Sequence, residues 1–228
     1  FSRHLFHENL SVRKICSSFL LDFQRMKPSV EIAFRLISFV SNEIDDELRQ
    51  SIFPRLVMDS KDPSLIKILS SLIRDASPVV ALGALKYLVK LADYPEVLQL
   101  LTSFITELME EVKRGTNTPV NGKMFLVFAE EAKNCVLLKQ LINSLAPEII
   151  KGLLRDKTKK STAVLKLLSL IIPSVPDSVS LPELVTIIDN GFAVHSSNKK
   201  LCSAVDLMCS ALKTTNLSNT IYGEHKFL

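Results

Sequence analysis

The fold of this chain is decided by residues 77–92, which read Ser77-Pro78-Val79-Val80-Ala81-Leu82-Gly83-Ala84-Leu85-Lys86-Tyr87-Leu88-Val89-Lys90-Leu91-Ala92. A serine at the N-cap position, followed by a proline at the first helical position, predicts a helix start. Val80, Ala84 and Leu88 then fall on one stripe, which Leu91 continues. We interpret the small residues Gly83 and Ala84 as a point of close packing against neighbouring helices rather than a place where a ligand approaches.

Helices of the same kind are predicted before and after this stretch. Apolar residues recur at three- and four-residue spacing, and we expect further helices at about 10–26, 29–41, 47–58, 62–74, 95–113, 123–133, 135–155, 161–172, 181–193 and 198–213. Pro54 is expected to kink or split its helix, and Pro147 to break its own. Residues 1–7 are predicted to be the remnant of a helix, and residues 116–121 to form a connecting loop.

The helix predicted at 10–26 is expected to be amphipathic. The apolar side chains that follow helical spacing, and so form its expected apolar face, are Val12, Ile15, Cys16, Phe19, Leu20 and Phe23.

These helices pair into units that repeat along the chain. The first helices of successive pairs start near residues 10, 45, 78, 119, 161 and 197, a period within the range of roughly 33 to 47 residues typical of helical solenoids. Because each such unit buries its apolar face only by stacking on its neighbours, we predict one array over residues 1–213. The predicted fold is all-α, a right-handed α-solenoid of about five to six stacked helical hairpins, and residues 214–228 form a tail that is partly disordered or folds back as a cap.

The first-helix residues resemble those of the HEAT and armadillo-like superfamily. Its pattern is a Pro or Asp turn, then Val, often Arg, a small residue four positions on and Leu four beyond; the matching residues are Asn9, Val12, Arg13, Cys16 and Leu20, and Pro78, Val80, Ala84 and Leu88. No short third helix is evident in each unit, so the chain is more similar to HEAT than to armadillo repeats. The resemblance implies a scaffold, a transport receptor, a vesicle-adaptor trunk or a chromosome-associated assembly.

Composition excludes several other classes of protein. The chain has 228 residues, of which 47% are hydrophobic and 23% charged, so it can bury a sizeable core and is too apolar to be disordered. There are 6 glycines and no tryptophan, and no Asn-Gly or Asp-Gly signal predicts a hairpin of strands. No run of about 18 apolar residues predicts a membrane span. The chain starts with Phe1 rather than Met, so we expect it to be a segment of a longer solenoid.

The four cysteines predict a reducing compartment. They form no C-x-x-C pair, and each lies among apolar residues of a helical pattern: Cys16, Cys135, Cys202 and Cys209. Buried free thiols of this kind are typical of the cytoplasm or the nucleus.

The sequence offers no recognisable catalytic constellation. It contains no G-x-S-x-G, no glycine-rich phosphate loop and no H-E-x-x-H. His4 and His7 are three residues apart, but a zinc site needs three or more ligands and nothing nearby supplies them. The absence of tryptophan and the presence of only 3 tyrosines argue against a lesion-reading DNA glycosylase. We therefore expect no enzymatic activity, cofactor, metal or small-molecule substrate.

The second helix of each pair is expected to line the concave face of the solenoid and to contact a partner there. Its polar positions are Arg35, Lys67, Gln99, Lys139, Asn143 and Glu183. Asn143 stands alone, so the asparagine ladder by which armadillo importins hold a peptide is not predicted. Mixed polarity favours a folded or helical partner; the alternative is an ordinary solvated helix face.

Basic residues gather at the later turns between units, whereas the turn near residue 45 is acidic. They are Lys123, then Lys157, Lys159 and Lys160, then Lys199 and Lys200. On the preceding helix, Lys151 and Arg155 are expected to extend the second of these clusters. Such an array can meet phosphates or an acidic partner in a salt-sensitive way, although the net charge of +4 does not by itself imply nucleic acid. The alternative is that these side chains only solvate their turns.

These features predict a non-catalytic scaffold or adaptor segment that binds another protein, or the rest of its own parent chain. The partner is expected on the concave face or at an end of the array, because terminal units expose apolar surface unless they are capped. A nucleic-acid- or chromosome-associated solenoid that uses the basic turns is the alternative. A nuclear-transport or vesicle-adaptor solenoid is a third reading.

Overall fold

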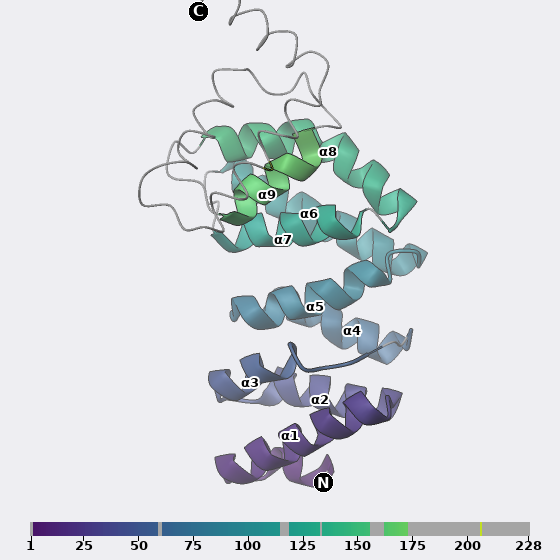
Figure 1. The fold of residues 1–228 in the computed structure, drawn as a ribbon, viewed down its shortest axis with the longest axis vertical. Coiled ribbons are helices and arrows are strands. Elements are labelled where there is room, and N and C mark those ends of the chain that lie inside the picture. The colour runs from purple at the N-terminus through teal and green to yellow at the C-terminus, as the bar shows by residue number, and fades with distance from the viewer. Residues whose placement is uncertain are drawn as a thin grey trace, which may run out of the picture. The chain divides into compact units, whose positions relative to one another are not determined.

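The structure is a computed structural model that describes residues 2–58, 61–114, 119–132, 134–155, 162–172 and 206. Within these ranges the regular structure is entirely helical, as the sequence predicts. In the described residues a 3₁₀ helix, η1, is followed by nine α-helices (Figure 1). Their bounds are η1 Ser2–Phe6, α1 Leu10–Met26, α2 Val30–Asn42, α3 Asp46–Ile52, α4 Pro63–Leu72, α5 Pro78–Lys90, α6 Pro95–Lys113, α7 Pro119–Glu131, α8 Val136–Arg155 and α9 Thr162–Ile171. Apart from residue 206, the helices predicted at 181–193 and 198–213 and the tail 214–228 lie outside the described residues.

Prolines and capping side chains set where these helices begin. Four of the helices, α4, α5, α6 and α7, have proline as their first residue, where the missing N–H costs nothing. The helix expected from Lys123 therefore starts four residues earlier, at Pro119. The Asn9 side chain accepts a hydrogen bond from the backbone N–H of Ser11 and caps α1. Ser77 occupies the N-cap position of α5, but its side chain makes no capping hydrogen bond.

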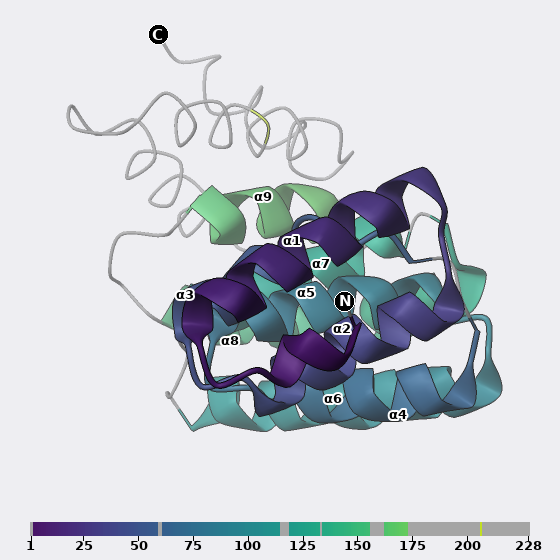
Figure 2. The same cartoon turned by 90° about the horizontal axis from the view of Figure 1, so that it is seen from below.

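The chain divides into two compact units, residues 1–100 and 101–228, and the division falls inside α6. In the first unit α1 contacts α3 and α3 contacts α5, while α2 contacts α4. In addition, α1 packs on α2, and α4 packs on α5. Figure 2 shows α1 and α3 on one side of this unit and α4 on the other. Its core contains the fully buried side chains Leu36, Ile37, Phe39, Ile52, Leu65, Leu69 and Leu85.

Two arginines join separate elements of the first unit. Arg13 of α1 forms a bidentate ion pair with Glu43, in the turn between α2 and α3. Arg49 of α3 donates to the backbone carbonyl of Val40, in α2, and pairs with Asp75, in the turn before α5. Each arginine therefore ties one helix to a turn farther along the chain.

The connection between α3 and α4 differs from the sequence prediction. The helix predicted over 47–58, with a kink or split expected at Pro54, ends at Ile52, because Pro54 has no N–H to continue the helical ladder. The segment that follows is held from both sides by side-chain hydrogen bonds to its backbone. Gln24 of α1 donates to the Val57 carbonyl at 2.8 Å, and the Tyr87 hydroxyl of α5 donates to the Leu56 carbonyl.

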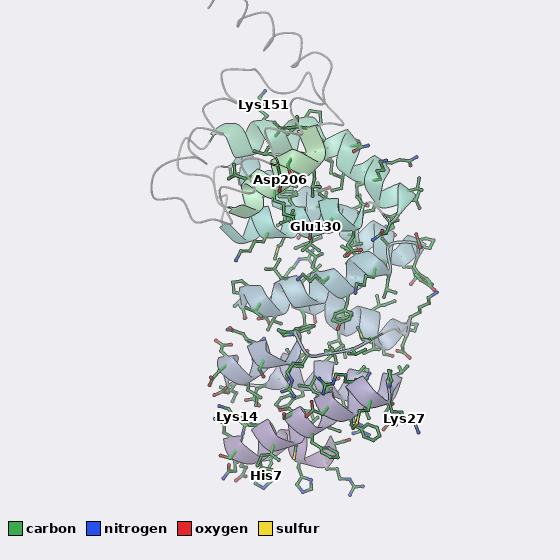
Figure 3. The ribbon with its side chains drawn as sticks, in the orientation of Figure 1. His7, Lys14, Lys27, Glu130, Lys151 and Asp206 are labelled. Carbon is green, nitrogen blue, oxygen red and sulfur yellow. The ribbon has the colours of Figure 1, made fainter. Side chains whose placement is uncertain are left out.

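The second unit is built around α7, which packs along α9, while α8 contacts both. The rings of Phe104 and Phe128 pack with their centroids 6.4 Å apart. Lys166 of α9 pairs with Glu130 of α7. Glu130 is labelled in Figure 3.

The predicted break at Pro147 is wrong. The helix α8 runs through this proline to Arg155. The proline removes one backbone hydrogen bond, but Ala146, Ile149 and Ile150 around it are buried. A continuous helix keeps these apolar side chains packed, which offsets the lost bond.

Candidate partner-binding surfaces

An apolar face of α1 is exposed to solvent. Four side chains at helical spacing form this α1 face, with exposed fractions of 66% for Ile15, 45% for Phe19, 37% for Phe23 and 76% for Met26. They recur at intervals of four, four and three residues, which places them on one stripe of the helix. Single exposed apolar residues are ordinary on a protein surface, but a contiguous row of this kind marks an interaction site.

This finding corrects the predicted apolar face of α1. Of the predicted set, Ile15, Phe19 and Phe23 are exposed, whereas Cys16 and Leu20 are buried. The buried side also includes three residues outside that set, Ser17, Leu21 and Gln24. The apolar side chains of α1 cover a wider arc of the helix than the neighbouring elements bury.

A groove runs along α5 in the first unit and consists of two adjoining cavities that share Tyr87 and Lys90. The first cavity has a volume of about 370 Å³ and is lined by Met58, Lys61, Tyr87, Lys90, Leu91, Asp93 and Tyr94. The second has a volume of about 390 Å³ and is lined by Phe53, Pro54, Leu56, Val79, Leu82, Gly83, Lys86, Tyr87 and Lys90. We call this surface the α5 groove.

The first cavity of the α5 groove combines lysine ammonium groups with tyrosine rings. The Nζ atom of Lys61 lies 4.9 Å from the centre of the Tyr94 ring, and that of Lys90 lies 5.8 Å from the centre of the Tyr87 ring. Both distances lie within the reach of a cation–π attraction. Burial raises the pKa of Tyr87 above its ordinary value.

The α5 groove was not predicted as a binding surface. Partner contacts were predicted on the second helix of each pair, whereas α5 covers a stretch predicted to be a first helix. The available signal was the spacing of Lys86, Tyr87 and Lys90, which share one side of α5, together with Tyr94 one turn further along the chain.

Three of the residues predicted for the concave face lie on helices of the first unit. Arg35 is on α2, Lys67 on α4 and Gln99 on α6, and all three are exposed. Arg35 pairs with Glu31 one turn earlier in its own helix at 3.0 Å, so the Glu31 carboxylate partly neutralises its charge. Glu183 lies outside the described residues.

Lys139 and Asn143, also predicted for the concave face, border one cavity. Both lie on α8, and the cavity of about 230 Å³ has otherwise apolar walls, formed by Ala129, Ala132, Ile142, Leu170 and Ile171. One lysine and one amide on an apolar wall do not by themselves define a ligand.

The predicted basic cluster is described only in part. Lys123 lies on α7 and is exposed. Lys151 lies near the end of α8 and is also exposed (Figure 3). Arg155 is the last residue of α8, and its side chain is not described. The other predicted lysines lie outside the described residues, namely Lys157, Lys159, Lys160, Lys199 and Lys200.

The rings of His4 and His7 stack with their centres 6.4 Å apart. In the part of the chain that the structure describes, no group of three or more His, Cys, Asp or Glu side chains is placed to hold a metal ion. Cys16 and Cys135 are buried free thiols, as predicted, whereas Cys202 and Cys209 lie outside the described residues. Among the described helices, none is both long and apolar enough to cross a bilayer.

Comparison with known proteins identifies no relative: no family model, curated protein or solved structure matches this chain.

Proposed function

We propose that this chain is a HEAT-like scaffold segment that binds another protein. The proposed arrangement is a solenoid in which first and second helices form two layers. It is supported inside the first unit by the contacts of α1 with α3, of α3 with α5 and of α2 with α4. The ion pairs Arg13–Glu43 and Arg49–Asp75, which link separate elements of this unit, also support it.

The observation that carries the binding function is the α1 face. Ile15 and Met26, at its two ends, expose 66% and 76% of their surface. The row covers about three turns, or roughly 16 Å of helix. A partner that covers this apolar surface gains a free energy of about 25 cal/mol for each Å² removed from water.

The partner that fits the α1 face is an amphipathic helix of another protein. A row of side chains at four- and three-residue spacing forms a ridge, and such ridges pack into the grooves between the side chains of a second helix. Recognition of this kind uses apolar anchors at positions i, i+3 or i+4 and i+7 of the partner. About three turns of an amphipathic helix match the length of the row.

Site-specific photocrosslinking in the cell of origin tests this function. A photoreactive amino acid at position 15 should crosslink to an apolar residue in a helix of a second protein. The same photoreactive amino acid in place of Lys14, which lies outside the α1 face, should not crosslink to that protein. Equal crosslinking from both positions, or crosslinks confined to this chain, would show that the α1 face is not a docking site.

Polar variants provide the matched control. The double variant Ile15→Ser/Met26→Ser should abolish co-purification of the crosslinked protein and leave the thermal midpoint nearly unchanged, since both side chains are exposed. The double variant Lys14→Ser/Arg25→Ser changes two exposed residues of the same helix and should retain the partner. Retention by the first variant would contradict the proposal.

A further inference from the structure

We propose that the α5 groove binds an acidic peptide segment of a partner protein that also carries an apolar side chain. The groove is separate from the α1 face, because none of its lining residues belongs to α1. Its two cavities differ in chemistry, and this difference defines the ligand.

One half of the groove is apolar. Phe53, Leu56, Val79 and Leu82 line the second cavity. Val79 exposes 40% of its surface, so the apolar wall is accessible to a ligand. Gly83 contributes no side chain here, which lets the Phe53 ring lie directly against the helix. The volume of about 390 Å³ falls within the range in which protein sites hold ligands.

The other half is cationic. Lys61 and Lys90 border the first cavity, and Asp93 is the acidic residue in its lining. Lys86 adds a third ammonium group to the rim of the neighbouring cavity. Among the described lining residues of the two cavities, three lysines stand against one aspartate, which is an excess of positive charge. The tyrosine rings beneath Lys61 and Lys90 restrain both ammonium groups, so less side-chain entropy is lost when an anion binds.

The two halves meet at Tyr87 and Lys90, which line both cavities. A ligand that fills the groove therefore places an apolar side chain against the apolar wall of the second cavity and an anionic group within reach of the lysines, two of which, Lys86 and Lys90, also line that cavity. An acidic peptide with a leucine side chain beside its carboxylates meets both requirements. An inorganic phosphate or a nucleic-acid backbone satisfies only the cationic half, so these ligands become outcomes of the test.

Tyrosine fluorescence of the full chain is a suitable readout, because the protein has no tryptophan and 3 tyrosines. Two of them, Tyr87 and Tyr94, line the groove. The probes are an array of glutamate- and aspartate-rich peptides of about ten residues with one leucine each and no tyrosine or tryptophan. We expect at least one to bind with a Kd below about 1 mM, and binding to weaken as salt is added.

Charge reversal locates the site. The double variant Lys86→Glu/Lys90→Glu should raise the Kd of the best peptide about tenfold or more. The double variant Lys27→Glu/Lys67→Glu changes the net charge by the same amount at exposed lysines outside the groove and should change the Kd less than about twofold. Thermal melts of both variants should coincide with that of the parent chain, which separates loss of binding from loss of folding.

Three results would overturn the proposal. The first is that no acidic leucine peptide of the array binds below about 1 mM. The second is that both charge-reversal variants weaken binding equally, which would indicate a general attraction to a basic protein. The third is that the apolar half takes no part in binding. This would follow if replacing leucine by glycine in the peptide left the Kd unchanged, or if inorganic phosphate or a single-stranded oligonucleotide competed as well as the peptide.

Discussion

Arg13 binds the carboxylate of Glu43 through two nitrogen atoms of its guanidinium. Its Nε donates to Oε2 at 2.7 Å and its Nη2 to Oε1 at 2.9 Å, and the Glu43 side chain is only 2% exposed. The backbone N–H groups of Ile44 and Asp45 also donate to Oε1, each at 2.9 Å. A single carboxylate therefore holds α1 against the turn that joins α2 to α3.

Replacing Glu43 by Gln should lower the free energy of unfolding by about 1.5 to 3 kcal/mol, the range for hydrogen bonds to charged groups. An amide cannot accept both guanidinium bonds, and Arg13 would remain as a cation without its anionic partner. Urea denaturation measures the change. The matched control is Glu47→Gln, because the Lys14–Glu47 pair is exposed and such pairs contribute about 0 to 1 kcal/mol. Equal losses in the two variants would contradict this account.

Stability in acid should depend on the same carboxylate. Burial raises the pKa of Glu43, but the hydrogen bonds from Arg13 and from the Asp45 and Ile44 amides outweigh burial, so the pKa is lowered from 4.5. A lowered pKa in the folded state contributes stability above the pKa of the unfolded state, and this contribution is lost as pH falls through the folded value. Urea midpoints measured from pH 7 downwards should therefore fall, and Glu43→Gln should flatten the decline below about pH 4.5.

Gly83 is expected to tolerate no larger side chain. A Cβ atom built there would lie 2.5 Å from Cγ of Phe53 and 2.6 Å from its Cβ, atoms close to the backbone that cannot swing aside. Gly83→Ala should gain up to about 1 kcal/mol of helix propensity and lose about 1 to 3 kcal/mol to overpacking. Thermal melts should therefore show net destabilisation or, at best, no gain. A higher melting temperature would mean that Phe53 moves away without cost.

Tyr87 is expected to stabilise the irregular segment after α3. Its hydroxyl donates to the Leu56 carbonyl, so Tyr87→Phe should lower the free energy of unfolding by about 0.5 to 1.5 kcal/mol. Burial raises the pKa of this phenol. The contribution is complete below the unfolded pKa of about 10 and is lost as pH rises through the higher folded value. The parent chain and the Tyr87→Phe variant should therefore differ in denaturation at pH 7 and converge well above about pH 10; a difference that persists undiminished in alkali would contradict this role.

Ser77 and Asn9 should respond differently to alanine although both precede a helix. Asn9 accepts a hydrogen bond from Ser11 at 2.8 Å, so Asn9→Ala should cost about 0.5 to 2 kcal/mol. The Ser77 hydroxyl is buried and has no hydrogen-bond partner among the described residues, so Ser77→Ala should be neutral or slightly stabilising. Equilibrium unfolding of the two variants measures this contrast, and an equal cost would show that Ser77 does cap α5.

The positions of the helices were largely predictable, because the signals that define them are local. A proline before an apolar row marks a helix start wherever it occurs, as at Pro63, Pro78 and Pro95. The effect of a proline inside a row was not predictable. Pro54 ends α3, whereas α8 continues through Pro147, although buried apolar side chains flank both prolines.

Candidate binding surfaces were less predictable than helices. Apolar side chains cover a wide arc of α1, so spacing could not tell that Cys16 and Leu20 pack inward while Ile15 remains exposed. The polar residue Gln24 is buried on the inward side because it bonds to the Val57 carbonyl and to the Ser29 N–H. Its partners lie on other elements and cannot be identified from the sequence of α1.

The sequence by itself determined that the described part of this chain is helical, where most of its described helices begin, and that Gly83 lies at a point of close packing. These properties follow from spacing and backbone chemistry within a few residues. Only the tertiary structure decided which part of each apolar arc is covered, that Glu43 receives Arg13 from a distant part of the chain, and that Lys90 and Tyr94 border one cavity. Such features depend on contacts between separate elements, and burial and electrostatics act through those contacts rather than along the chain.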